Sequence, residues 1–134
     1  MDEARNTKVV QDAYAAFGRG DIPALLALMD PGVEWTAVIG SNTPTSGTRH
    51  GHAGVAEFFQ QLGASLDFQR FEPQEFVAQG DKVVALGHYL GTWKATGRSF
   101  ESDWVMVFTI RNGLTTRFQE FADSAGINAA FGSV

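Results

Sequence analysis

The segment RFQEFADSAG, residues 117–126, places two carboxylates three residues apart, Glu120 and Asp123. Its phenylalanines alternate as in a β-strand, where successive side chains point to opposite faces. Glu120 therefore shares a face with Phe118 and Ala122, whereas Asp123 points the other way. A carboxylate on an apolar face is costly unless it is paired, hydrogen-bonded or protonated. Burial would raise the pKa of Glu120 toward neutrality, where general-base catalysis is most effective.

Both acids also have an ordinary structural interpretation. A glutamate on an amphipathic strand is often a solvated residue at the rim of a sheet, and the pattern leaves this alternative open. Asp123 precedes a short segment, Ser124 to Phe131, that could form a helix, and aspartate is a favoured N-cap residue. We therefore expect Asp123 to be structural and treat Glu120 as the candidate functional acid.

The neighbours of Glu120 depend on how the preceding strands pair. A two-residue turn at Thr96-Gly97 would set Tyr89 opposite Trp104. The next turn is either the two residues Asn112-Gly113 or three residues that begin at Arg111. The three-residue turn keeps apolar residues opposite one another and sets Trp104 opposite Glu120, so it is the preferred register.

Tyr89, Trp104 and Glu120 would then lie side by side on one face of the sheet. A concave aromatic face with one acid and one phenol is typical of a small-molecule pocket. The same aromatic residues could instead form plain core, with their polar atoms bonded to neighbours. The small residues expected to leave space around them are Gly87, Gly91, Ser102 and Ala122.

The three histidines have two possible interpretations, as metal ligands or as residues with structural contacts. His50 and His52 lie close together in HGH, but they lack a convincing third ligand, so we expect no metal. We include His50 among the residues of the pocket. His88 lies on the opposite face of its strand, where Asp103 could pair with it in a structural role.

The elements that must position these residues follow from the spacing of apolar side chains. A period of 3.6 predicts two helices before the DPG at residues 30–32 and a third through residues 55–62. VEWTAVI, residues 33–39, is typical of a strand, and residues 40–51 form a long polar loop that could be a lid. From about Phe71 the period becomes 2, and three turn signals divide the remainder into four antiparallel strands.

This order of elements predicts an α+β domain with helices on one face of a curved antiparallel sheet. The other face carries Leu90, Val105 and Val107, and a second copy of the chain could cover it. We therefore expect a homodimer.

Composition narrows the function classes. With 134 residues, of which 44% are hydrophobic, the chain predicts a single domain over residues 1–134 with one core. The net charge is -5 and no basic run occurs, which argues against nucleic acid and anionic membranes as partners. The absence of cysteine and the polar start MDEARNTK are compatible with a soluble cytoplasmic protein.

Four segments together resemble the SnoaL-like group of the nuclear transport factor two-like superfamily. They are AYAAFGRGDIPALLALMDPGVEW, GHAGVAEFF, VVALGHYLGTWKATGRSFESDWVMVFTIRNG and RFQEFADSAG. The group contains ketosteroid isomerases, polyketide cyclases and limonene epoxide hydrolases. The resemblance implies a cone-shaped curved antiparallel sheet wrapped around N-terminal helices, a cystatin-like α+β barrel, with a deep apolar pocket and dimerisation through the outer face.

The resemblance also implies roles for single residues. The acid that activates water in the limonene epoxide hydrolases falls at Glu120, but two charged partners fall at Gly87 and Tyr89, which argues against that mechanism. Polyketide cyclases of the group use a pocket acid as general base, and Glu120 is the nearest match. Trp35 falls near a pocket tyrosine of the epoxide hydrolases and is expected to form a wall, together with Trp104 and Phe118.

These observations predict an enzyme that abstracts a proton next to a carbonyl of a small apolar molecule. Glu120 would be the general base and Tyr89 the donor to the developing enolate oxygen, without a cofactor. A non-catalytic binding protein for apolar ligands, with Glu120 orienting a polar group, is the main alternative. An oligomerisation module with a vestigial pocket is another.

Overall fold

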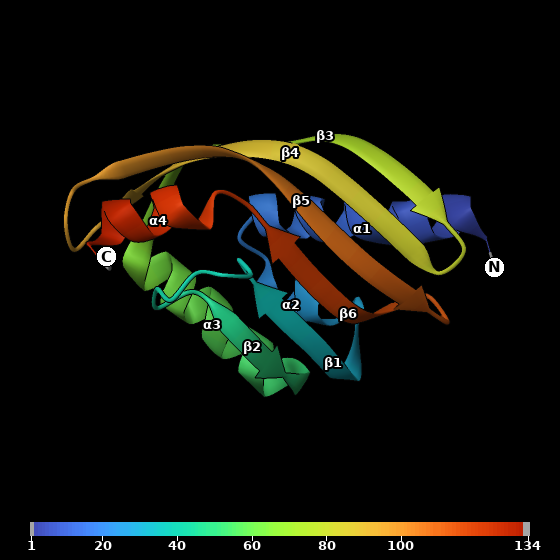
Figure 1. Ribbon diagram of the computed structural model, residues 1–134. Helices are drawn as coiled ribbons and strands as arrows, with labels where there is room; N and C mark the ends of the chain where they lie inside the picture. The colour runs from blue at the N-terminus through green and yellow to red at the C-terminus, as the bar shows by residue number, and fades with distance from the viewer. Residues whose placement is uncertain (1, 133–134) are drawn as a thin grey trace.

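The computed structural model describes residues 2–132 and has the α+β fold that the sequence predicts. Six strands form one curved sheet in the order β2-β1-β6-β5-β4-β3, which arches over the helices (Figure 1). The helices are α1 Glu3–Gly18, α2 Ile22–Leu26, α3 Gly51–Ser65 and α4 Ser124–Phe131. The strands are β1 Met29–Ala37, β2 Gly47–His50, β3 Leu66–Gln79, β4 Lys82–Trp93, β5 Ser99–Arg111 and β6 Leu114–Phe121.

In the part of the chain that the structure describes, no helix is long and apolar enough to cross a membrane.

The sheet is mixed rather than wholly antiparallel, which corrects one part of the sequence prediction. β1 runs parallel to β6, with Trp35 beside Phe118, whereas the other neighbouring strands are antiparallel. Turn residues predict antiparallel hairpins, but most of the chain separates β1 from β6 and no turn joins them. Local sequence patterns therefore carry no signal for this pair.

Two boundaries near the N-terminal half also differ from the prediction. α2 ends at Leu26 and Met29 already belongs to β1. Pro31 favours an extended conformation at Asp30, which agrees with its place in this strand. The loop predicted over residues 40–51 is shorter, because Gly47–His50 forms β2 and pairs with β1. α3 follows directly at Gly51.

β4 and β5 pair two residues away from the predicted register. Tyr89 lies opposite Ser102, and Trp104 lies opposite Gly87. The connection is not a two-residue turn, since it spans residues 94–98 between the two strands. A shift of two residues preserves the alternation of faces, so Tyr89 and Trp104 remain on the concave face.

The turn between β5 and β6 is the two-residue Asn112-Gly113, so the preferred three-residue alternative was wrong. Both residues have positive φ, 53° and 77°, as a type I′ hairpin turn requires. A register shift next to Thr109 then displaces β6 relative to β5. Because of this shift, Glu120 lies on the concave face of the sheet. The facing pairs beyond the shift are Phe108 with Phe118 and Met106 with Glu120.

On the convex face, His88 lies between two carboxylates, and its predicted pairing with Asp103 is confirmed. Nδ1 of His88 is 2.8 Å from Asp103 Oδ1, and Nε2 is 2.7 Å from Glu101 Oε2. The hydrogen bond to Glu101, together with the one to Asp103, raises the pKa of His88 above its ordinary value. His88 therefore links β4 to β5 across the outer surface.

Candidate functional site

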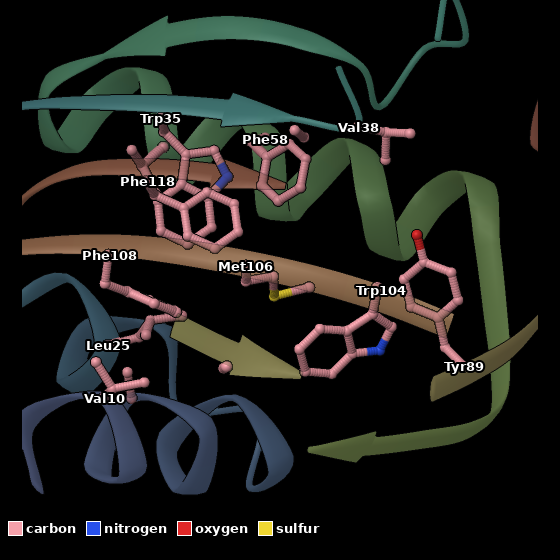
Figure 2. Close-up of a cluster of buried hydrophobic side chains, with 14 of the residues drawn as sticks. Val10, Leu25, Trp35, Val38, Phe58, Tyr89, Trp104, Met106, Phe108 and Phe118 are labelled. Carbon is pink, nitrogen blue, oxygen red and sulfur yellow. The ribbon is translucent and has the colours of Figure 1, made fainter. Parts of the chain in front are cut away.

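A cavity lies between the concave face of the sheet and the helices. The empty space among its lining side chains is about 820 Å³, a volume that includes the part open to solvent. Aromatic and aliphatic side chains form most of its wall. Figure 2 shows several of them within the cluster of buried hydrophobic side chains. Among the described residues, Glu120 is the one carboxylate that lines it. Half-buried rings at the wall between α1, α3 and β3 belong to Phe17, Phe59, Phe68 and Phe71.

Glu120 is buried in this cavity, with 6% of its surface exposed. Its Oε2 accepts a hydrogen bond of 2.9 Å from the Tyr89 hydroxyl, and its carboxylate also accepts from the backbone N–H of Val38. Burial raises the pKa of Glu120 to about 7, while the two hydrogen bonds act in the opposite direction. The side chain can therefore bind and release a proton near neutral pH.

The backbone at Val38 is strained where it meets Glu120. Val38 has a φ of 35°, a region that β-branched residues rarely occupy. The next residue, Ile39, donates its backbone N–H to the carbonyl of Glu120 at 2.9 Å. These contacts join the end of β1 to β6 at the residue that carries the buried acid. Strained backbone of this kind tends to occur at functional sites.

Tyr89 comes from β4 and is almost fully buried, with 2% of its surface exposed. Burial, and then the negative charge and hydrogen bond of Glu120, raise the pKa of Tyr89 above its ordinary value. The phenol therefore stays protonated and donates a hydrogen bond to the carboxylate. Figure 2 shows its hydroxyl directed toward the end of β1, where Val38 lies. The structure thus brings the predicted pair, Glu120 and Tyr89, into contact.

Trp35 and Phe118 form one wall of the cavity, from adjacent strands β1 and β6. Figure 2 shows their rings stacked. The ring centroids are 3.7 Å apart and the interplanar angle is 13°. Trp35 is 5% exposed, and its indole Nε1 has no hydrogen-bond partner among the described residues. A buried donor without a partner typically destabilises a protein by about 1–3 kcal/mol.

Trp104 does not line the cavity, which corrects its predicted place in the pocket wall. Its ring lies behind the wall, 5.4 Å from Phe71 and 5.8 Å from Tyr14 between centroids. A Cβ added at Gly87 would collide with the indole ring of Trp104. The space that Gly87 was expected to leave for a ligand is therefore filled by this indole.

His50 also lies outside the cavity lining, so its predicted place in the pocket is wrong. It is exposed at the end of β2, opposite Glu34 of β1. The neighbouring His52 contacts the carbonyl of Met29 through Nε2 at 2.9 Å. The described residues contain no group of three His, Cys, Asp or Glu side chains that could hold a metal ion.

The sequence did not predict most of the lining residues, and Tyr14 and Thr45 are two examples that carry a hydroxyl group. Tyr14 lies on the apolar face of α1, where its spacing signalled core packing, and its hydroxyl donates to Met106 Sδ at 3.0 Å. Thr45 comes from the connection between β1 and β2 and is 4% exposed. Arg49 holds this connection by donating to the carbonyls of Pro44 and Ser46, each at 3.2 Å. No local pattern distinguishes such a residue from an ordinary loop threonine.

Comparison with known proteins places this geometry in a family. The family model described as SnoaL-like domain matches residues 10–118. No curated protein sequence matches the chain. An NTF2-like protein from Burkholderia xenovorans LB400 is 37% identical, with a TM-score of 0.90, and the match covers 97% of this chain and 98% of that one.

Two further solved structures are similar over nearly their whole length. TerC, co-crystallised with polyporic acid, is 30% identical with a TM-score of 0.78, covering 96% of this chain and 99% of TerC. A proposed polyketide cyclase from Xanthomonas campestris pv. campestris is 24% identical with a TM-score of 0.76, covering 96% and 97%, and shares the fold. The chain therefore belongs to the SnoaL-like domain family, within the NTF2-like superfamily.

Proposed function

We propose that the protein is an enzyme that abstracts a proton from the carbon next to a carbonyl of a small apolar molecule. The observation that carries this proposal is Glu120, a carboxyl group with a pKa of about 7 in the wall of an apolar cavity. A general base works best when its pKa lies near the working pH. Apolar walls with few polar groups are typical of small-molecule sites.

In the proposed reaction, the ionised carboxylate of Glu120 accepts a proton from the α-carbon of the substrate. The electron pair of the C–H bond forms a new C=C bond, and the carbonyl π electrons move to oxygen to give an enolate. Protonated Glu120 then returns its proton to the same carbon or to another carbon of the enolate, so no cofactor is needed. The Tyr89 hydroxyl, 2.9 Å from Oε2 of Glu120, holds the carboxyl group in place between proton abstraction and proton return.

Tyr89 has a different task here from the one expected from the sequence. Its hydroxyl has one O–H group, which already donates a hydrogen bond to Glu120 in this structure. We therefore assign Tyr89 to positioning the base, while the enolate oxygen is assigned to another donor.

The similarity to TerC supports a small-molecule ligand, because that relative, 30% identical, was crystallised with polyporic acid. The fold by itself supports less, since related folds host unrelated functions. The proposal therefore depends on the chemistry of Glu120 more than on the family.

The test is deuterium exchange at the α-carbon of 1-tetralone, a small bicyclic aryl ketone, in D₂O at pH 7. We expect the parent protein to accelerate the exchange and Glu120→Gln to lower the rate by about a hundredfold or more, because the amide cannot accept the proton. Glu34→Gln is the matched control, because Glu34 lies outside the cavity and pairs with Arg117 at 3.5 Å. A parent protein that gives no exchange above the buffer rate would contradict the proposal.

A non-catalytic binding protein is the second candidate, and the apolar character of the wall favours it. In that case Glu120 serves only to orient a polar group of the ligand. Calorimetry with 1-tetralone separates the two functions: Glu120→Gln would weaken binding, while neither protein would accelerate exchange.

A further inference from the structure

Trp35 presents a hydrogen-bond donor that the chain itself does not use. Its indole Nε1 is buried and unpartnered among the described residues, and the side chain lines the cavity. Buried donors in folded proteins nearly always have a partner, so each exception requires an explanation. In Figure 2 the indole nitrogen is directed toward Phe58, across the space between the two rings.

The other phenol and indole donors that line the cavity are already engaged. The Tyr89 hydroxyl donates to Glu120 at 2.9 Å, and the Tyr14 hydroxyl donates to Met106 Sδ at 3.0 Å. The indole of Trp93 donates to the carbonyl of Ile127 at 3.2 Å. Trp104 has the second unpartnered indole among the described residues, but it does not line the cavity.

Trp35 and the proposed base share one wall of the cavity. Trp35 is the Cα partner of Phe118 in the parallel pair of β1 and β6. Glu120 follows two residues later on the same face of β6, and two residues of a strand span roughly 7 Å. Trp35 and Glu120 are therefore neighbours on one wall, which suits a ligand whose acceptor oxygen and acidic C–H are close together, as in a ketone.

We propose that the indole N–H of Trp35 binds the carbonyl oxygen of the substrate, and that the substrates are flat aryl ketones. The flat rings are expected to contact the aromatic wall, while the α-carbon faces Glu120. The Phe58 ring lies beside this N–H, with its centroid 5.8 Å from that of Trp35, so the proposal requires Phe58 to change rotamer when the oxygen binds. This assignment rests on the proposed function for the site, and it supplies the donor that the enolate oxygen requires.

The first experiment observes the indole N–H groups directly. The chain has three tryptophans, so a ¹⁵N-labelled sample gives three indole signals, assigned by replacing each tryptophan. Addition of 1-tetralone should move the Trp35 signal downfield, as expected for a new hydrogen bond, while tetralin, which lacks the carbonyl, should not. The Trp93 signal is the internal reference, because its N–H is already bonded. A ketone that binds without moving the Trp35 signal, or that does not bind, would overturn the assignment.

The second experiment compares two substitutions. Trp35→Phe and Trp104→Phe each remove one buried, unpartnered indole N–H, but only Trp35 lines the cavity. Trp35→Phe should reduce the preference for 1-tetralone over tetralin about tenfold, the effect of one good hydrogen bond. Trp104→Phe should leave this preference unchanged. An equal loss in both variants would overturn the assignment.

These measurements are independent of the test of Glu120. If the Trp35 signal moves but the protein accelerates no exchange, the catalytic proposal fails and the ketone site remains. If exchange depends on Glu120 but the Trp35 signal does not move, the assignment of Glu120 as the base holds and the assignment of Trp35 as the donor is wrong.

Discussion

The proton on Glu120 links the candidate site to the stability of the whole chain. Burial raises the pKa of this carboxyl from 4.5 to about 7, so the folded state binds more protons than the unfolded state between these values. The stabilising contribution is therefore complete below pH 4.5 and is lost as the pH rises through about 7. The largest change over this window is roughly 3 kcal/mol in the free energy of unfolding.

Glu120→Gln isolates this contribution because glutamine does not titrate. Relative to the parent, the variant should become steadily more stable between pH 4.5 and 7, and the difference should then level off. Urea unfolding of both proteins at several pH values measures it. His88 also has a raised pKa, but it is present in both proteins and cancels in the comparison. Parallel stability curves would show that Glu120 ionises normally.

At the scale of single elements, α4 shows how one residue sets the start of a helix. Asp123 is its N-cap, and the carboxylate accepts from the backbone N–H of Gly126 at 3.0 Å, as the sequence predicted. The helix then brings Ile127 into the cavity wall, and the carbonyl of Ile127 accepts from the indole of Trp93.

Asp123→Ala should lower the free energy of unfolding by about 1 kcal/mol, because the helix loses its cap. Asp123→Asn should be nearly neutral, since asparagine caps as well as aspartate. Chemical denaturation of the three proteins measures both effects. An alanine variant as stable as the parent would contradict the structural role, and so would loss of 1-tetralone binding in the asparagine variant.

At the scale of the whole molecule, the convex face of the sheet carries an apolar patch. Val84 pairs with Val107, and Val105 lies between Leu86 and Phe121. Phe121 is 41% exposed, and Figure 1 shows α1 and α3 on the other side of the sheet. Large apolar patches on a surface commonly mark an interface, so we propose that a second copy of the chain covers this one.

Val107→Glu should then convert dimers to monomers, because it places a charge at the centre of the patch. Sedimentation velocity at micromolar concentration measures the state of each protein. Gln11→Glu is the control, since it adds the same charge on an exposed position of α1, away from the sheet. A monomeric parent protein under these conditions would contradict the proposal.

Several features of this protein follow from local patterns in its sequence. The alternation of strand residues placed Glu120, Tyr89 and Phe118 on the concave face, and it did so despite errors in both hairpin registers. In both hairpins, the observed pairing near the site differs from the predicted pairing by two residues. A shift by an even number of residues leaves every side chain on its original face. The capping of α4 was likewise predictable, because an N-cap depends only on residues that are neighbours in the chain.

The tertiary structure decided which of these inward residues form the cavity. Trp104 and Trp35 are both buried tryptophans on strands, yet one lies behind the wall and the other lines it. That difference arises from the register shift beside β6, from the pairing of Trp104 with Gly87, and from the parallel contact of β1 with β6. Each of these depends on contacts between residues far apart in the chain. Periodicity determines the face of a side chain, but its neighbours on that face are determined by packing between distant segments.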